Sequence, residues 1–211
     1  MRLLAHIISA VFQPLLMPSL VVYTLLYHVE NSTPLTEGGQ SRVLMLVFLT
    51  TCLIPVLIVL GFYHFKLIKD IQMTDRKDRR FPFMFVSIFY VVVTYLFHQQ
   101  PVLERSPLLL LALLAMTAVV LLTNLITYFW KISAHSAGVV GWLSFIMVFA
   151  KTNPGNNTLL YPLMAAILLS GVVIWARLYL NAHKPVEIVG GALLGFVICY
   201  GAIYYGSIYY V

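Results

Sequence analysis

The chain has 211 residues, of which 61% are hydrophobic and only 9% are charged. Soluble domains carry about 25% charged residues, so this composition excludes an ordinary soluble enzyme and favours a protein that crosses a lipid bilayer several times. The formal net charge of +6 would suggest nucleic acid in a soluble protein, but here the cations stand beside apolar segments. This placement suits phosphate or anionic lipid headgroups, and we expect no nucleic-acid partner.

Seven apolar segments are candidates for membrane-spanning helices, because a helix needs roughly 20 apolar residues to cross a bilayer. We expect the short third and fifth segments to tilt or to be extended by neighbouring polar residues. The sequence therefore predicts an all-α, polytopic transmembrane bundle of about seven spans, with six as the alternative. In chain order the segments are Leu3–Tyr27, Val43–Phe65, Phe83–Phe97, Leu108–Trp130, Ala137–Ala150, Leu159–Ala176 and Ile188–Tyr210.

Three polar segments follow the second, fourth and sixth spans: Lys66–Pro82, Lys131–Ser136 and Arg177–Glu187. With seven spans, all three emerge on the same side of the membrane, where most of the Lys and Arg residues also lie. The positive-inside tendency would place this side in the cytoplasm. A phosphate site recruits the same residue types, however, so the membrane face of the site stays open. We expect an integral protein of a bacterial inner (cytoplasmic) membrane.

The first polar segment combines many cations with the only aspartates of the chain. One interpretation is a solvated connector. The other is a phosphate clamp, because guanidinium groups form forked, charge-assisted hydrogen bonds to phosphate oxygens. Arg79 and Arg80 are best placed for this role, since they stand beside Phe81-Pro82, where the chain is expected to re-enter the membrane.

The second polar segment places His135 between Ser133 and Ser136, just before an expected helix. Either serine can cap that helix or donate a hydrogen bond, and the free N–H groups of a helix start favour an anion. The plain alternative is a capped helix with an interfacial histidine.

The third polar segment brings Arg177, His183 and Glu187 together. The six-residue step from Arg177 to His183 does not keep them on one helical face, so we expect Arg177 to end the sixth span. His183 and Glu187 are four residues apart and can be neighbours on a helix, with Pro185 at an early helical position. A carboxylate that holds one imidazole nitrogen leaves the other free to act as nucleophile or base. The plain alternative is an interfacial salt bridge.

Together these segments resemble the type 2 phosphatidic acid phosphatase (PAP2) superfamily of membrane lipid phosphatases. Ala176-Arg177, His183 and Glu187 keep the spacing of its third signature, with Glu in place of Asp, and Ser133 and His135 match the Ser and His of its second. The first signature is divergent: Lys69 and Arg76 keep the Lys-to-Arg spacing, but Lys77 follows where the family has proline. The resemblance covers about residues 66–200 and leaves the first two spans outside. We therefore expect two N-terminal transmembrane helices in residues 1–65 and a PAP2-like catalytic core in residues 66–211, within a single membrane domain.

The resemblance implies a phosphatase for a lipid or prenyl phosphate, acting without metal or cofactor through a phosphohistidine on His183. Glu187 would orient the nucleophile, and His135 would protonate the leaving alkoxide and then activate water. The phosphate oxygens would be held by six side chains: Arg177, Ser133, Arg79, Arg80, Arg76 and Lys69. Two alternatives remain, a lipid phosphotransferase and a catalytically weakened membrane binding or scaffold protein. Partners other than the substrate and membrane lipids are not predicted, and the oligomeric state stays open.

Overall fold

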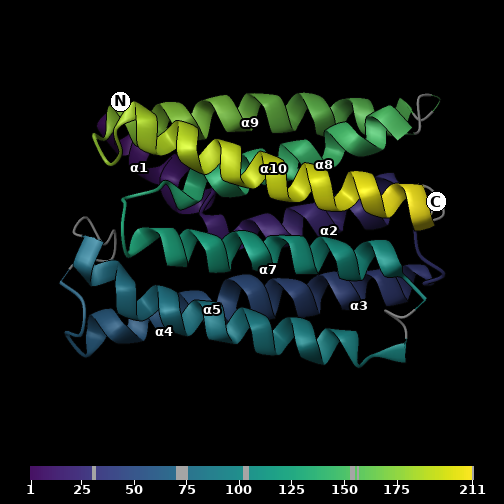
Figure 1. The fold of residues 1–211 in the computed structure, drawn as a ribbon, viewed down its shortest axis with the longest axis horizontal. Helices are drawn as coiled ribbons and strands as arrows, with labels where there is room; N and C mark the ends of the chain where they lie inside the picture. The colour runs from purple at the N-terminus through teal and green to yellow at the C-terminus, as the bar shows by residue number, and fades with distance from the viewer. Residues whose placement is uncertain (30–31, 70–75, 102–104, 153–154, 156, 211) are drawn as a thin grey trace.

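The computed structural model describes residues 1–29, 32–69, 76–101, 105–152, 155 and 157–210, and of residues 76–78 and 210 it describes only the backbone. All regular secondary structure among these residues is helical, and turns join the helices. The helices run side by side as one bundle, with α7 between a group containing α8, α9 and α10 and a group containing α3, α4 and α5 (Figure 1). The predicted all-α bundle is therefore confirmed.

Among the described residues, seven helical stretches are long and apolar enough to cross a membrane, so the chain is an integral membrane protein. The first three are built from α1 (Arg2–Val11), η1 (Pro14–Leu16) and α2 (Met17–His28), then α3 (Glu37–Phe48), η2 (Leu49–Leu53) and α4 (Ile54–His64), then α5 (Arg76–His98). The last four are α7 (Pro107–Thr127), α8 (Ala134–Thr152), η3 (Asn157–Leu159) with α9 (Leu160–Tyr179), and α10 (Pro185–Tyr210).

The structure contains the seven predicted spans, but their first and last residues differ from the predicted ones. The third and fifth reach 20 and 19 residues, because polar residues at their starts join the helices, as expected. The third is helical from Arg76, before Pro82. Arg79 and Arg80 therefore lie on α5 itself, at the point where the sequence predicted that the chain re-enters the membrane.

Prolines interrupt the first two spans. Gln13 is extended (φ −68°, ψ 153°) before Pro14, the conformation that a residue preceding proline prefers. In the second span the π-helical turn η2 precedes Pro55. Proline has no N–H for the carbonyl four residues earlier, and that carbonyl, of Thr51, accepts a hydrogen bond from the Tyr90 hydroxyl at 2.7 Å.

The starts of α8 and α10 are clamped together by glycines and backbone hydrogen bonds. A Cβ on Gly191 would collide with the Ser133 carbonyl and the Ser136 hydroxyl, and one on Gly195 with the Ala137 carbonyl. The Ser133 N–H donates to the Glu187 carbonyl at 3.1 Å. These glycines allow close helix packing, and the packing fixes the second and third polar segments relative to each other.

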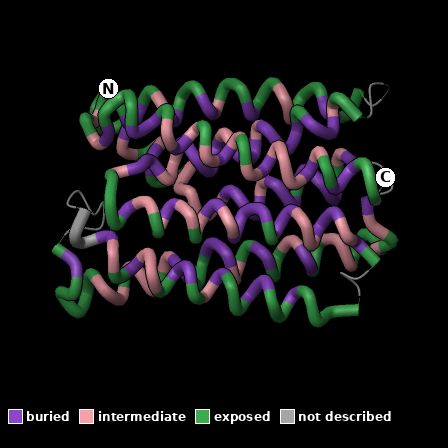
Figure 2. Tube along the Cα trace, viewed as in Figure 1, coloured by how far each residue is buried: buried purple, intermediate pink, exposed green. Residues whose placement is uncertain are grey.

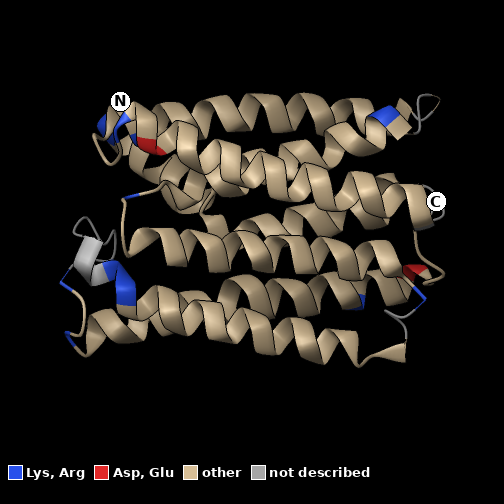
Figure 3. Cartoon of the chain, viewed as in Figure 1, with Lys and Arg blue, Asp and Glu red and all other residues tan. Residues whose placement is uncertain are grey.

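Buried and exposed residues alternate along each helix, and the buried ones meet along the middle of the bundle (Figure 2). The charged residues lie at its two ends, and most of the Lys and Arg residues drawn are at the end that holds the chain's N-terminus (Figure 3). Residues of all three polar segments line one cavity, as the prediction that these segments emerge on one side requires.

Candidate active site

A tight turn carries the chain from Arg177 to His183. At the end of α9 the N–H of Asn181 donates to the Leu178 carbonyl at 2.9 Å, and the N–H of Ala182 donates to the Arg177 carbonyl at 3.1 Å. This pair of bonds is the Schellman motif, which needs a left-handed residue after the helix. Asn181 supplies it with φ 51°, a conformation that asparagine tolerates better than most residues. The turn brings His183 back beside the end of α9.

His183 is held by Glu187, one turn into α10. The His183 Nδ1–H donates to Glu187 Oε2 at 2.9 Å, and the Lys184 N–H donates to the same oxygen at 3.1 Å. Glu187 is the third residue of α10, after Pro185 at its start, so the second bond is the return half of a capping box. The glutamate therefore orients the imidazole and caps the helix at once. Both bonds meet on one oxygen of a buried carboxylate.

His183 is a neutral imidazole at physiological pH. Burial, together with the positive charges of Arg79, Arg177 and Lys131, lowers the pKa of His183 to about 3. Because Nδ1 carries the proton that it donates to Glu187, the lone pair is on Nε2. No hydrogen bond joins this Nε2 to another described residue. The arrangement is that of an oriented nucleophile.

His135 stands in the first turn of α8, which Ser133 caps. The Ser133 hydroxyl accepts the Ser136 N–H at 3.3 Å, and the Ser136 hydroxyl donates to the carbonyls of Ser133 and Ile188 at 3.0 and 2.9 Å. The imidazole of His135 points away from these bonds, and its Nε2 contacts the Ser9 carbonyl at 3.0 Å. The cap thus fixes the backbone that carries His135.

Two buried arginines flank the histidines. Arg79 from α5 and Arg177 from α9 are 5% and 6% exposed, although both carry a full charge. Nε of Arg177 has no hydrogen-bond partner among the described residues. A buried charge without a partner is costly, so this guanidinium is arranged to meet an anion.

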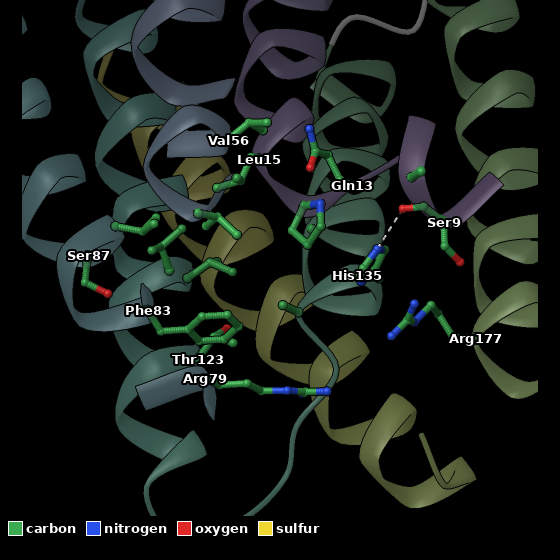
Figure 4. A pocket seen from close by; sticks show the side chains of 18 of the residues that line it. Ser9, Gln13, Leu15, Val56, Arg79, Phe83, Ser87, Thr123, His135 and Arg177 are labelled. Carbon is green, nitrogen blue, oxygen red and sulfur yellow. Dashed lines mark hydrogen bonds between the residues drawn. The ribbon is translucent and has the colours of Figure 1, made fainter. Parts of the chain in front are cut away.

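His135, His183, Arg79 and Arg177 all line one cavity of about 610 Å³. Figure 4 shows part of this cavity. Arg79 and Arg177 extend toward the space beside His135, whereas Val56 and Leu15 lie at the other end of the view. The rest of the wall is mainly apolar and comes from α1, η1 and the start of α2 in the first span, and from α4, α5, α7 and α8. A volume in this range is typical of a ligand site, and the cavity joins a cationic end to an apolar one.

The structure describes the side chains of three of the other four predicted phosphate ligands, and one of the three lines the cavity. Lys69 lines the cavity and is exposed. Ser133 is fully buried and is not among the lining residues. Arg80 also lies off the cavity wall, where its Nη2 donates to the Tyr128 carbonyl at 3.5 Å and its guanidinium stacks over the Tyr128 ring. The side chain of Arg76 lies outside the described residues.

Sequence reasoning missed the contribution of the first span. His6, Ser9 and Gln13 all line the cavity, although no motif singled them out. The signal available in the sequence was Pro14, which interrupts an apolar run close to two polar side chains. Among the described residues, no group of three or more His, Cys, Asp or Glu side chains is placed to hold a metal ion.

A family model, the PAP2 superfamily, matches residues 116–208. This part of the chain is therefore similar to the PAP2 superfamily, in agreement with the resemblance found in the sequence. The match contains Ser133, His135, Arg177, His183 and Glu187, and it supports a phosphatase-type function. No curated protein and no solved structure gave a match to the chain.

The PAP2 match begins within α7 and extends through most of α10. Arg79 and Lys69 lie outside it, and so do Ser9 and the apolar wall that α2 and α4 contribute. The PAP2 segment thus holds both histidines and Glu187, and the cavity in front of them is completed by helices from the first half of the chain.

Proposed function

We propose that the protein hydrolyses a lipid or prenyl phosphate through a phosphohistidine formed on His183. The observation that carries the proposal is the pairing of a neutral, oriented His183 with two buried arginines at the cationic end of a largely apolar cavity. An amphiphile with a phosphate head would place its charge between Arg79 and Arg177 and its chain against the apolar wall.

In the first step, Nε2 of His183 attacks phosphorus, and the bond between phosphorus and the alkoxide oxygen breaks. The leaving oxygen takes a proton from Nδ1 of His135, which must be in its imidazolium form at that moment. Glu187 keeps the Nδ1–H of His183 in place and balances the positive charge that develops on the ring. Arg177 and Arg79 stabilise the equatorial oxygens of the transition state.

In the second step, neutral His135 accepts a proton from water, and the hydroxide oxygen attacks phosphorus. The bond between phosphorus and Nε2 breaks, its electron pair returns to His183, and phosphate leaves. The alcohol and the phosphate together account for the atoms of one water molecule and one ester. An alcohol in place of water would make the same site a phosphotransferase.

Phosphate release from a panel of lipid and prenyl phosphates tests the proposal, with purified wild-type protein in detergent and without added metal. We expect wild type to release phosphate and His183→Ala to release none above background. During turnover of a ³²P-labelled substrate we expect acid-labile, base-stable ³²P on the wild-type protein, because phosphohistidine is hydrolysed by acid and survives base.

Equal release by wild type and His183→Ala would overturn the proposal. Appearance of the phosphate on an added alcohol instead of in solution would assign the transferase reaction. Binding of lipid phosphates without turnover by the wild-type protein would identify a scaffold or binding protein.

A further inference from the structure

The first span reaches the histidine pair through a backbone carbonyl. Ser9 lies in α1, and its carbonyl oxygen is 3.0 Å from Nε2 of His135, across 126 positions of the chain. A carbonyl oxygen can only accept a hydrogen bond, so Nε2 of His135 carries a proton. The lone pair of the neutral ring is therefore on Nδ1, to which no hydrogen bond from another described residue is found.

The break in the span makes this carbonyl available. In an unbroken helix the Ser9 carbonyl would accept the N–H of Gln13. Here α1 ends at Val11, and Gln13 turns into an extended conformation before Pro14. Ser9 is consequently one of the last four residues of α1, whose carbonyls lack intrahelical partners. The contact with His135 satisfies one of them.

The same break is packed tightly against α8. Gly138 lies three residues after His135, and a Cβ added there would lie 2.8 Å from Cγ of Met17 and 3.5 Å from Cα of Pro14. The absence of a side chain at Gly138 thus lets the end of α1 approach the helix that carries His135. Figure 4 shows this approach, with the dashed line joining Ser9 and His135.

The charged and titratable groups that interact with His135 are Arg177, His183 and Arg79, from α9, the turn before α10, and α5. All three are neutral or positive. The Ser9 carbonyl is a partial negative charge at the end of a helix, where the helix dipole also favours cations. It therefore stabilises the imidazolium that His135 forms whenever it takes up a proton.

We propose that the broken end of α1 is a positioning element of the active site, in which the Ser9 carbonyl holds Nε2–H of His135 so that Nδ1 gives and recovers the catalytic proton. This inference rests on the proposed function, in which His135 acts as acid and base. Ser9 is a positioning residue, because it acts through His135. The proposal also gives the first span, which lies outside the PAP2 match, a role in the reaction.

Two variants disturb the contact by different routes. Pro14→Ala restores an N–H and lets the helix continue, so that the N–H of Gln13 competes for the Ser9 carbonyl. Gly138→Ala pushes Pro14 and Met17 away from α8. The matched controls are Pro107→Ala, at the start of α7 where a proline N–H has no helical partner, and Gly171→Ala, where an added Cβ meets nothing within 4 Å.

The readout compares two leaving groups in single-turnover experiments, with a long-chain alkyl phosphate and p-nitrophenyl phosphate as the probes. An alkoxide needs a proton from the acid, whereas p-nitrophenolate leaves without one. General acid catalysis contributes about 10²–10⁴-fold. We expect both variants to slow alkanol release at least about tenfold and to change p-nitrophenol release less than about twofold, while both controls match wild type.

Nitrogen NMR of histidine-labelled protein provides a measurement that does not depend on turnover. Wild type should show the Nε2–H tautomer for His135, assigned by its loss in His135→Ala, and both variants should show a mixture of tautomers. Equal slowing of the two substrates, or an unchanged ratio with an unchanged tautomer, would overturn the positioning role while leaving the proposed function intact. If His135→Ala itself fails to separate the two substrates, the acid assignment in the proposed function is wrong.

Discussion

The two halves of the bundle are built differently. In the half that carries the PAP2 match, α8 packs most extensively against α10, and glycines bring their backbones into contact. In the N-terminal half, two spans are interrupted, at Pro14 and at the π-helical turn before Pro55. The first half of the chain thus supplies freed carbonyls and an apolar wall, and the second supplies a rigid frame for the histidines. Close packing of α8 against α10 suits catalytic side chains that must keep a fixed geometry. Interrupted helices suit the part of the cavity that has to accommodate the hydrocarbon chain of a substrate.

In the half that carries the PAP2 match, substitution of Glu187 is expected to have the largest effect. We expect Glu187→Ala to slow phosphorylation of His183 by at least about a hundredfold, because the ring loses the partner that fixes its tautomer and orientation. Glu187→Asp keeps a carboxylate and should stay within about tenfold of wild type. Single-turnover formation of phosphoprotein measures both. A Glu187→Ala protein as fast as wild type would mean that the pair serves only the fold.

Gly195 tests whether the frame itself depends on backbone contact. Gly195→Val forces a side chain against the Ala137 carbonyl, and overpacking of this kind costs about 1–3 kcal/mol or more. We expect a lower thermal midpoint in detergent, together with loss of phosphatase activity. Gly201→Val in the same helix is the control, since an added Cβ there meets nothing within 4 Å. Similar midpoints for the two variants would contradict the clamp.

A substitution at Val59 tests whether α4, in the N-terminal half, contacts the hydrocarbon chain of the substrate. It lines the cavity, whereas Leu57 on the same helix does not and is 55% exposed. Filling part of an apolar pocket discriminates by about 10-fold or more between chains of different length. We expect Val59→Trp to lower kcat/KM for long-chain phosphates about tenfold and to spare short-chain ones. Leu57→Trp should leave the chain-length profile unchanged, and a matching shift in both variants would argue against this wall.

The smallest expected effect is on the pKa of His183, which the positive charge of Arg79 on α5 influences. Arg79 contributes to lowering the pKa of His183, so Arg79→Met should raise that pKa toward the ordinary value of about 6.5. Arg80→Met, one residue along and off the cavity wall, is the control. Histidine NMR in the ligand-free protein between pH 4 and 8 measures the change. Titration of wild-type His183 near pH 6.5 would show that the site is less buried than the structure indicates.

The lowered pKa also predicts how stability depends on pH. Between about pH 6.5 and pH 3 the unfolded chain holds a proton on His183 that the folded protein has released. The unfolded state therefore binds more protons, and this group destabilises the fold as pH falls through that range. His183→Gln should lose less thermal stability than wild type between pH 7 and pH 5.

Local pattern predicted a large part of the site. The four-residue step from His183 to Glu187 was enough to predict that the two side chains meet, although His183 lies in the turn before α10 and not on the helix. The parity of seven spans was enough to predict that three polar segments lie on one side. Arg80 shows the limit of such reasoning, because adjacent arginines on a helix point about 100° apart. Only the packing of α5 against α7 decides that Arg79 enters the cavity and that Arg80 turns to Tyr128.

The amino-acid sequence by itself determined the membrane class, the number of spans and the chemical types of the reacting side chains, because these follow from hydropathy, spacing and charge along the chain. The tertiary structure decided which cations face the phosphate cavity, that Ser133 caps a helix, and that the carbonyl of Ser9 meets His135. The physical reason is that a backbone carbonyl is the same in every residue. Its availability depends on where a helix breaks, and its partner depends on which helix packs against the break.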